Sequence, residues 1–247
     1  MFTSLDIYSS LLILFAISIG GFTKGVISFG LPLVSLPILS FVLNPKQAIF
    51  LLFFTVIAVN LREIKFKNFE SYKKVTFLSL GVFAGIIIGS ILFHKIEDNL
   101  ISQLIGFMIV LTAIINFTNL KIDKKLLLNK YFSTLYGFFC GLIGGMTTLV
   151  GPLIAVYLVS LKLEREEFSE LISLTIFSCL IPIYSVFFIY QPVLFNDYLI
   201  SLSLVIPAVI MQKFGFKIRK KLPQNIFKKI ILVILTVIGS AVIFKNW

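Results

Sequence analysis

The chain has 247 residues, of which 58% are hydrophobic and only 13% are charged, and its mean hydropathy is +1.04. This composition lies outside the range of soluble globular domains and predicts a polytopic membrane protein. A net charge of +11 would suggest a nucleic-acid partner in a soluble protein. Here most of the Lys and Arg residues lie in three short connections, at about 62–74, 119–130 and 213–229. Basic connections of this kind face the cytoplasm, so no nucleic-acid partner is expected.

Hydrophobic runs bounded by Gly, Pro and charged residues recur along the whole chain. They predict helical segments at about 5–23, 31–43, 47–61, 75–93 and 100–117 in the first half, and at about 131–148, 152–161, 168–190, 198–211 and 230–244 in the second. The first segment carries Asp6 where a secretory signal would carry Lys or Arg, so a retained helix is expected. The expected fold class is an all-α polytopic membrane protein with about 8–10 membrane segments, forming a single transport domain over residues 1–247.

Two stretches rich in Gly and Pro interrupt these runs, GGFTKGVISFGLPLVSLP at 20–37 and GFFCGLIGGMTTLVGPLI at 137–154. Glycine and proline weaken or remove helix hydrogen bonds, and broken backbone inside a membrane must be protected by protein. The two stretches therefore predict helix breaks, the first directly after Thr23 and the second at Gly144-Gly145 and Gly151-Pro152. The short segments that follow are either thin membrane crossings or re-entrant hairpins.

The two halves have the same order of segments, which predicts two repeats at about 5–118 and 131–244, with Pro37 corresponding to Pro152. Their equivalent connections differ in charge. The Lys-rich connection at 62–74 corresponds to 191–197, which has no Lys or Arg. Opposite charge bias is expected when two repeats have inverted topology in the membrane.

Several small residues inside the predicted segments have packing as their expected role. Gly81, Gly85 and Gly89 recur every four residues, a spacing that allows helices to approach closely. Cys140 and Cys179 stand alone, without a second Cys or a His nearby, and are interpreted as small packing residues.

The breaks predict an anion site, because half-helix N-termini inside a membrane expose N–H groups and the positive end of the helix dipole. Lys24 would add one full positive charge. The expected substrate-binding residues are Lys24, Ser28 and Gly30 at the first break, Thr147, Thr148 and Gly151 at the second, and Asn60 within an apolar segment. Each has an alternative: Lys24 can end its helix and extend to the membrane surface, Asn60 can join helices, and the hydroxyls can bond their own backbone.

The segments KGVISFGLPLVSLPIL and GLIGGMTTLVGPLI, together with the region of Asn60, resemble the sulfite exporter TauE/SafE family of membrane permeases. Each half of those permeases begins with a Gly-rich motif punctuated by Pro. The resemblance covers nearly the whole chain and implies transport of small sulfur-containing or organic anions such as sulfite, sulfoacetate or other sulfonates. In the second motif, Met146, Thr147 and Thr148 depart from the Gly-rich pattern.

The preferred interpretation is a secondary transporter of a small anion in the cell membrane, working by alternating access, with no enzymatic activity. One alternative is a redox protein that carries reducing equivalents through Cys140 and Cys179, and another is a membrane scaffold without transport. His94 is the only histidine and there is no Walker A sequence, so neither a cofactor nor ATP hydrolysis is expected. The expected partners are a small anionic substrate and the lipid bilayer; the sequence leaves the oligomeric state open, a homodimer included.

Overall fold

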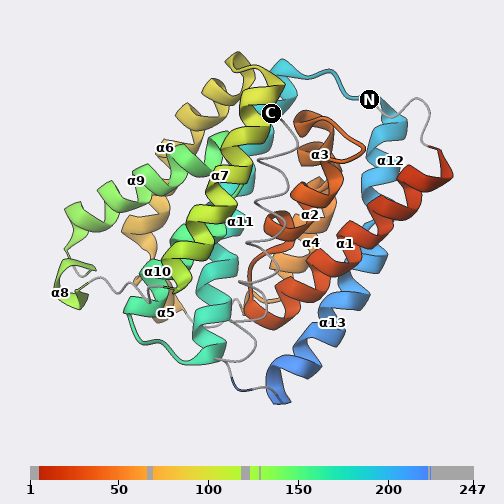
Figure 1. The fold of residues 1–247 in the computed structure, drawn as a ribbon. Helices are drawn as coiled ribbons and strands as arrows, with labels where there is room; N and C mark the ends of the chain where they lie inside the picture. Colours follow the sequence, from red (N-terminus) through yellow and green to blue (C-terminus); the bar gives the residue numbers. More distant parts are fainter. Residues whose placement is uncertain (1–5, 66–68, 118–122, 128, 222, 224–247) are drawn as a thin grey trace. The chain divides into compact units, whose positions relative to one another are not determined.

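The computed structural model describes residues 6–65, 69–117, 123–127, 129–221 and 223. In these residues every regular element is an α-helix (Figure 1), which confirms the expected all-α class. The helices are α1 (Ile7–Ile27), α2 (Leu31–Leu39), α3 (Pro45–Leu51), α4 (Phe53–Leu61), α5 (Phe69–Tyr72), α6 (Thr76–Lys95), α7 (Asp98–Phe117), α8 (Lys124–Leu127), α9 (Lys130–Thr147), α10 (Val150–Ser160), α11 (Arg165–Tyr190), α12 (Phe195–Ser203) and α13 (Val205–Lys221). The predicted segment at 230–244 lies outside the described residues.

The helices form two compact units, and each unit takes helices from both halves of the sequence. Unit 1 draws on residues 1–59, 97–117 and 192–247, and unit 2 draws on residues 60–96 and 118–191. Unit 1 therefore combines α1 to α4 with α7, α12 and α13, whereas α6 joins α9, α10 and α11 in unit 2. The proposed repeats at about 5–118 and 131–244 follow sequence order and stay a prediction.

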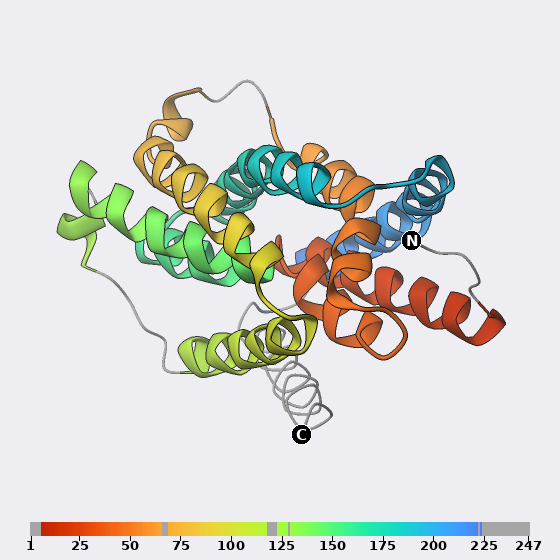
Figure 2. The same ribbon diagram turned by 90° about the horizontal axis from the view of Figure 1, so that it is seen from above.

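In unit 1, α1 and α13 lie side by side with their backbones in contact (Figures 1 and 2). A Cβ atom built on Gly25 would lie 2.3 Å from the carbonyl oxygen of Gln212, and one built on Gly215 would lie 2.3 Å from that of Phe22. No side chain fits at such distances, so this contact requires glycine on both helices.

Unit 2 contains an equivalent contact between α6 and α9, which run side by side in Figures 1 and 2. A Cβ atom on Gly85 would lie 2.1 Å from the carbonyl oxygen of Phe138, and one on Gly89 would lie 2.2 Å from that of Leu142. Gly81 lies against the same helix. The predicted packing role of these three glycines is therefore confirmed.

The two helix pairs match position by position. On α1 and α13, Gly21 lies against Ala208, Gly25 against Gln212, and Gly215 against Phe22; on α9 and α6, Gly141 lies against Val82, Gly145 against Ile86, and Gly89 against Leu142. The spacing is the same along both pairs, so α1 corresponds to α9 and α13 to α6. In this register Pro32, rather than Pro37, corresponds to Pro152. The predicted pairing of Pro37 with Pro152 was wrong because it matched similar apolar tripeptides instead of helix ends.

The helix breaks also differ in position from those predicted: the first lies later than Thr23, and the second lies between the predicted breaks at Gly144-Gly145 and Gly151-Pro152. The first helix continues beyond Thr23 to Ile27, and the helix of the second stretch continues through Gly144 and Gly145 to Thr147. Glycines such as Gly25 and Gly145 do not break their helices because they serve helix contact, and the surrounding turns keep their hydrogen bonds. The breaks themselves are confined to residues 28–30 and 148–149.

The short helix α2 doubles back along α1. Ser35 Oγ donates to the carbonyl oxygen of Ala16 (2.9 Å), and a Cβ atom on Gly20 would lie 2.1 Å from the same Oγ. Helices of nine and eleven residues, α2 and α10, are about 14 and 17 Å long and cannot cross about 30 Å of hydrocarbon alone. This favours re-entrant hairpins over thin crossings.

Three other predicted segments need correction, of which the one expected at about 198–211 is divided at Leu204 into α12 and α13. The segment expected at about 47–61 is divided at Leu52 into α3 and α4. The basic stretch that begins at Lys213, expected in a connection, remains helical to Lys221, and its last turn carries Arg219 and two lysines. Cations at the carboxyl end of a helix complement its dipole, so the basic residues extend α13 instead of ending it.

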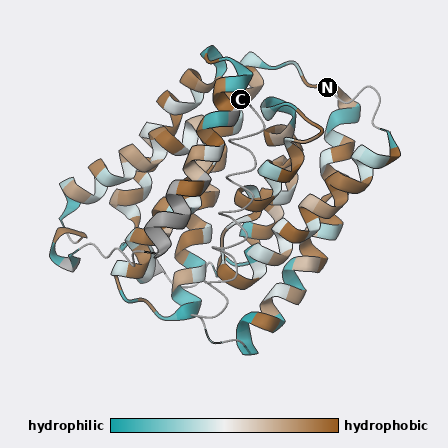
Figure 3. Ribbon diagram, viewed as in Figure 1, coloured by the Kyte–Doolittle hydropathy of each residue, from teal (hydrophilic) through white to brown (hydrophobic). Residues whose placement is uncertain are grey.

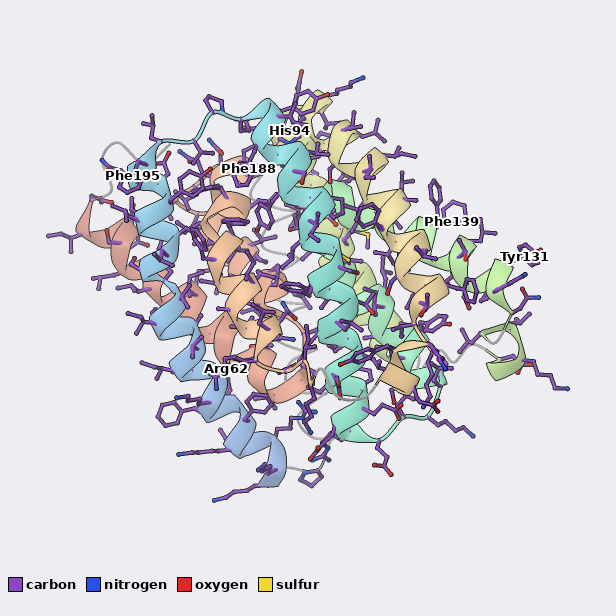
Figure 4. The ribbon with its side chains drawn as sticks, turned by 180° about the vertical axis from the view of Figure 1, so that it is seen from behind. Arg62, His94, Tyr131, Phe139, Phe188 and Phe195 are labelled. Atoms are coloured by element: carbon purple, nitrogen blue, oxygen red, sulfur yellow. The ribbon has the colours of Figure 1, made fainter. Side chains whose placement is uncertain are left out.

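Four helical stretches among the described residues are long and apolar enough to cross a membrane: α1, α6, α11 and the pair α12–α13. They have 20 to 27 residues, and about 20 residues span the hydrocarbon core. Hydrophobic positions run along these ribbons in Figure 3. Large apolar side chains such as Phe139 (55% exposed) and Phe195 (74% exposed) point outward in Figure 4. These features are those of a membrane protein, and the total of about 8–10 membrane segments stays a prediction.

Gly85→Ala should destabilise the protein, because the new methyl group would overlap the backbone of α9. Overpacking of this kind costs roughly 1–3 kcal/mol, which thermal unfolding of the detergent-solubilised protein would detect as a melting temperature lowered by several degrees. Ala84→Leu, on the exposed side of the same helix, is the matched control and should melt like the wild type. Equal melting temperatures for all three proteins would contradict the described backbone contact.

Candidate functional site

The first break is a short irregular turn between α1 and α2. The backbone of Ser28 is left-handed (φ 72°), and its N–H donates to the carbonyl oxygen of Lys24 (2.8 Å). Gly30, at φ 109°, has a conformation that residues with a Cβ rarely adopt. Helix α2 starts at Leu31 with Pro32 in its first turn, where the missing proline N–H is not needed. The predicted place of this proline is confirmed.

Lys24 lies inside this turn and not at the protein surface. Its side chain is only 1% exposed, and Nζ donates to the carbonyl oxygen of Ser28. Lys24 and Ser28 are therefore joined by two hydrogen bonds, one from the Lys24 side chain to the Ser28 backbone and one from the Ser28 backbone to the Lys24 backbone. A cation near the carboxyl end of a helix offsets the negative end of the helix dipole. The structure thus places the positive charge of Lys24 inside the break.

The break also contains the amino end of α2. The first N–H groups of a helix have no partner within the helix and carry the positive end of its dipole. No side chain makes a capping hydrogen bond at Gly30, the residue that precedes α2. Lys24, Ser28 and Gly30, which the sequence predicted as site residues, are thus brought together in one turn. Such a turn combines a full positive charge with backbone donors, the chemistry that recognises a small anion.

The second break, between α9 and α10, has a similar backbone but different side chains. Thr148 is left-handed (φ 59°), and its N–H donates to the carbonyl oxygen of Gly144. The hydroxyl of Thr147 donates to Ile143 O (2.8 Å) and accepts from Leu149 N (3.2 Å). The hydroxyl of Thr148 donates to Thr147 O (2.7 Å). Both hydroxyls bond their own backbone, the alternative role considered for them from the sequence.

In the register of the two helix pairs, Gly144 occupies the position on α9 that Lys24 occupies on α1. The second break therefore has no charge at the equivalent position. Gly151, predicted at the break, is buried in the first turn of α10. Asn60 lies in the last turn of α4 and is 2% exposed. Its backbone carbonyl oxygen accepts a hydrogen bond from Glu63 N (3.0 Å). Thr147, Thr148, Gly151 and Asn60 remain predicted site residues.

Sequence reasoning missed a buried carboxylate in unit 2, that of Glu63, which is 6% exposed. Its Oε2 accepts from Ser169 Oγ (2.9 Å) and Ser173 Oγ (2.6 Å), two hydroxyls one turn apart on α11. In sequence this Glu follows an apolar segment and precedes a basic connection, which is typical of a solvated loop. Its burial depends on serines more than 100 residues away.

A second buried carboxylate, Glu170 (5% exposed), holds the same connection to α11. Its Oε1 accepts from the Tyr72 hydroxyl (2.7 Å) and from Lys65 N (3.2 Å). Burial and the neighbouring Glu170 carboxylate raise the pKa of Tyr72 to about 12. Lys65 Nζ also pairs with Glu166 (2.7 Å), an exposed ion pair of the kind that contributes little to stability. The hydrogen bonds to the buried Glu170 carboxylate therefore fix this connection more than the exposed ion pair does.

The two cysteines are both free and buried, with Cys140 4% and Cys179 1% exposed. Cys179 Sγ donates to Thr175 O (2.9 Å). Buried thiols in apolar surroundings are chemically inert, so their environment favours the packing role over the redox alternative. His94 stacks on Tyr190 with ring centroids 4.8 Å apart. Within the described part of the chain, no group of three or more His, Cys, Asp or Glu residues is placed to hold a metal ion.

These features define a helical membrane protein in which two helices are broken by similar turns and each is packed on a partner through glycine. The family model described as Sulfite exporter TauE/SafE matches residues 12–242. The chain therefore belongs to this family of membrane transporters for sulfite or related anions, as its Gly- and Pro-rich segments indicated. No curated protein and no solved structure matches the chain.

Tyr72→Phe should lower the stability of the protein by about 1 kcal/mol, the typical contribution of one hydrogen bond, because Glu170 loses one of its donors. Thermal unfolding in detergent would measure the change. Tyr131→Phe, which removes a hydroxyl from a side chain that is 75% exposed (Figure 4), should leave the melting temperature unchanged. If both variants melt alike, Tyr72 does not anchor the connection to α11.

Proposed function

We propose that the protein is a secondary transporter that moves a small anion across the cell membrane by alternating access. Sulfite, a sulfonate or a related organosulfur or organic anion is the proposed substrate. Membership of the sulfite exporter TauE/SafE family supports this substrate class. In this proposal the protein crosses the membrane several times, and its partners are the anionic substrate and the lipid bilayer. A homodimer is compatible with the proposal.

The buried ammonium group of Lys24 is the observation that carries the proposal. Moving a charged group out of water costs several kcal/mol unless other groups compensate. The carbonyl oxygen of Ser28 accepts a hydrogen bond from this group, and the amino end of α2, with its N–H donors, lies in the same turn. A small anion bound at the first break would place a full negative charge beside the Lys24 ammonium group and would accept hydrogen bonds from the N–H groups at the start of α2. Lys24, Ser28 and Gly30 are thus the proposed core of the substrate site.

The matching helix pairs support the proposed alternating access. Transporters of this kind are commonly built from inverted repeats that rock around a substrate site. The contact of α1 with α13 is repeated between α9 and α6, as expected for repeated halves. The opposite charge of equivalent connections supports the inversion. Asn60, Thr147, Thr148 and Gly151 are proposed as further contributors to substrate binding.

Lys24→Ala should reduce the affinity for the anion by about ten- to a hundredfold, because hydrogen bonds to charged groups contribute about 1.5–3 kcal/mol. The measurement is flux of labelled sulfite in proteoliposomes over a range of concentrations. Lys217→Ala removes the same charge from an exposed position of α13 and should transport normally. Normal sulfite transport by the Lys24 variant would exclude this residue from the mechanism.

Thermal stabilisation of the purified protein should identify the substrate class. A ligand at 100 times its dissociation constant stabilises the folded state by about 2.7 kcal/mol. The wild type and the Lys24→Ala variant would be melted with sulfite, thiosulfate, sulfate, sulfonates and carboxylates. Stabilisation by one class, present in the wild type and lost in the variant, is the expected result. Stabilisation by no anion would favour a membrane scaffold without transport.

A further inference from the structure

Gln212 is a buried polar residue of α13 that neither the sequence pattern nor the family match singles out. Its exposed fraction is 0%, and its backbone carbonyl lies against Gly25, the residue that follows Lys24 on α1. A neutral amide side chain at a helix contact inside a membrane protein carries a desolvation cost unless its hydrogen bonds are satisfied. The packing of α1 on α13 alone does not explain why an amide side chain occupies this position.

The second helix pair supplies an internal comparison. Ile86 occupies the position on α6 that Gln212 occupies on α13, with its carbonyl oxygen against Gly145 of α9. Ile86 is apolar and 0% exposed. The same backbone contact thus forms without an amide, so helix packing does not require one. Lys24 and Gln212 are two of the positions at which unit 1 is polar and unit 2 is not, and Gln212 lies against Gly25, the residue that follows Lys24.

The side chain of Gln212 reaches a third helix. Its Nε2 donates to the carbonyl oxygen of Val59 in the last turn of α4 (2.8 Å). The last four carbonyl groups of a helix lack a partner within it, so this bond caps the carboxyl end of α4. Gln212 therefore links α13 to α4 through its side chain and contacts α1 through its backbone. The contact on α1 is at Gly25, the residue after Lys24.

We propose that Gln212 is a positioning residue of the anion site at the first break. Its backbone lies against Gly25 in the last turn of α1 and its amide anchors this part of α13 to α4, so it keeps the Lys24 ammonium group at the break. This inference rests on the proposed function, and its ligand is the same small oxyanion. Loss of the amide would leave the helices packed, as Ile86 leaves α6 and α9 packed, but would loosen the site and weaken binding.

Gln212→Met, which preserves length and removes the amide, tests the proposal in proteoliposomes supplied with sulfite. We expect the KM for sulfite to rise fivefold or more, with the maximal rate within twofold of the wild type. Ser201→Ala is the matched control, because Ser201 Oγ is also fully buried in unit 1 and donates to a carbonyl oxygen, that of Leu51 (3.0 Å). Both variants should lose a similar amount of thermal stability, whereas the control should keep the wild-type KM.

Two results would overturn the role of Gln212 while the proposed function stands. One is a wild-type KM for Gln212→Met under conditions in which Lys24→Ala is impaired. The other is a change in KM and in maximal rate that is the same for Gln212→Met and Ser201→Ala. Normal transport by Lys24→Ala would instead overturn the proposed site itself. If the Met variant does not accumulate, Gln212→Ile takes its place, because Ile86 shows that the contact accepts this side chain.

Discussion

Direct contact between helix backbones is the constraint on which both units depend. At Gly25 and Gly215 in unit 1, and at Gly89 and Gly145 in unit 2, any added Cβ atom would overlap the neighbouring helix. In lipid, where burial of apolar surface gives helices little reason to associate, such close packing is a main source of affinity between them. The contact also fixes the rotation of each helix about its axis. The irregular turns at Ser28 and Thr148 follow within one turn of these contacts, so their position is set by the same glycines.

Hydropathy was sufficient to predict the all-α class and most helical segments, because a helix that crosses lipid must be continuously apolar over about 20 residues. The exact breaks were not predictable. Glycine serves both to end helices and to let them touch, and only the partner helix distinguishes the two uses. The partner of Gly25 is Gln212, far away in sequence. Glu63 was missed for the same reason, since the hydroxyls that bury its carboxylate belong to α11. The left-handed residues that end α1 and α9 are Ser and Thr, which give no strong sequence signal.

The two units share a backbone plan but differ in the polarity of their side chains. Lys24 and Gln212 in unit 1 stand where unit 2 has Gly144 and Ile86. Unit 2 holds its polar groups elsewhere, in the carboxylates and hydroxyls that fasten the connection before α6 to α11. In the proposed anion site, one charged copy of the shared backbone plan would present a single positive group, that of Lys24, to the anion. Two such groups would bind the anion more tightly and hinder its release.

The interleaving of the units also determines the order in which the protein is completed during synthesis. The glycines of α6 meet α9 soon after both have left the ribosome, because only the connection through α7 and α8 separates them. The glycines of α1 can contact α13 only after α13 has been synthesised, and α13 lies almost at the other end of the described chain. At a translation rate of about 5–20 residues per second, that delay lasts roughly 10–40 s. During this interval the last turn of α1, which carries Lys24, lacks the backbone contact with α13 that packs it in the folded protein.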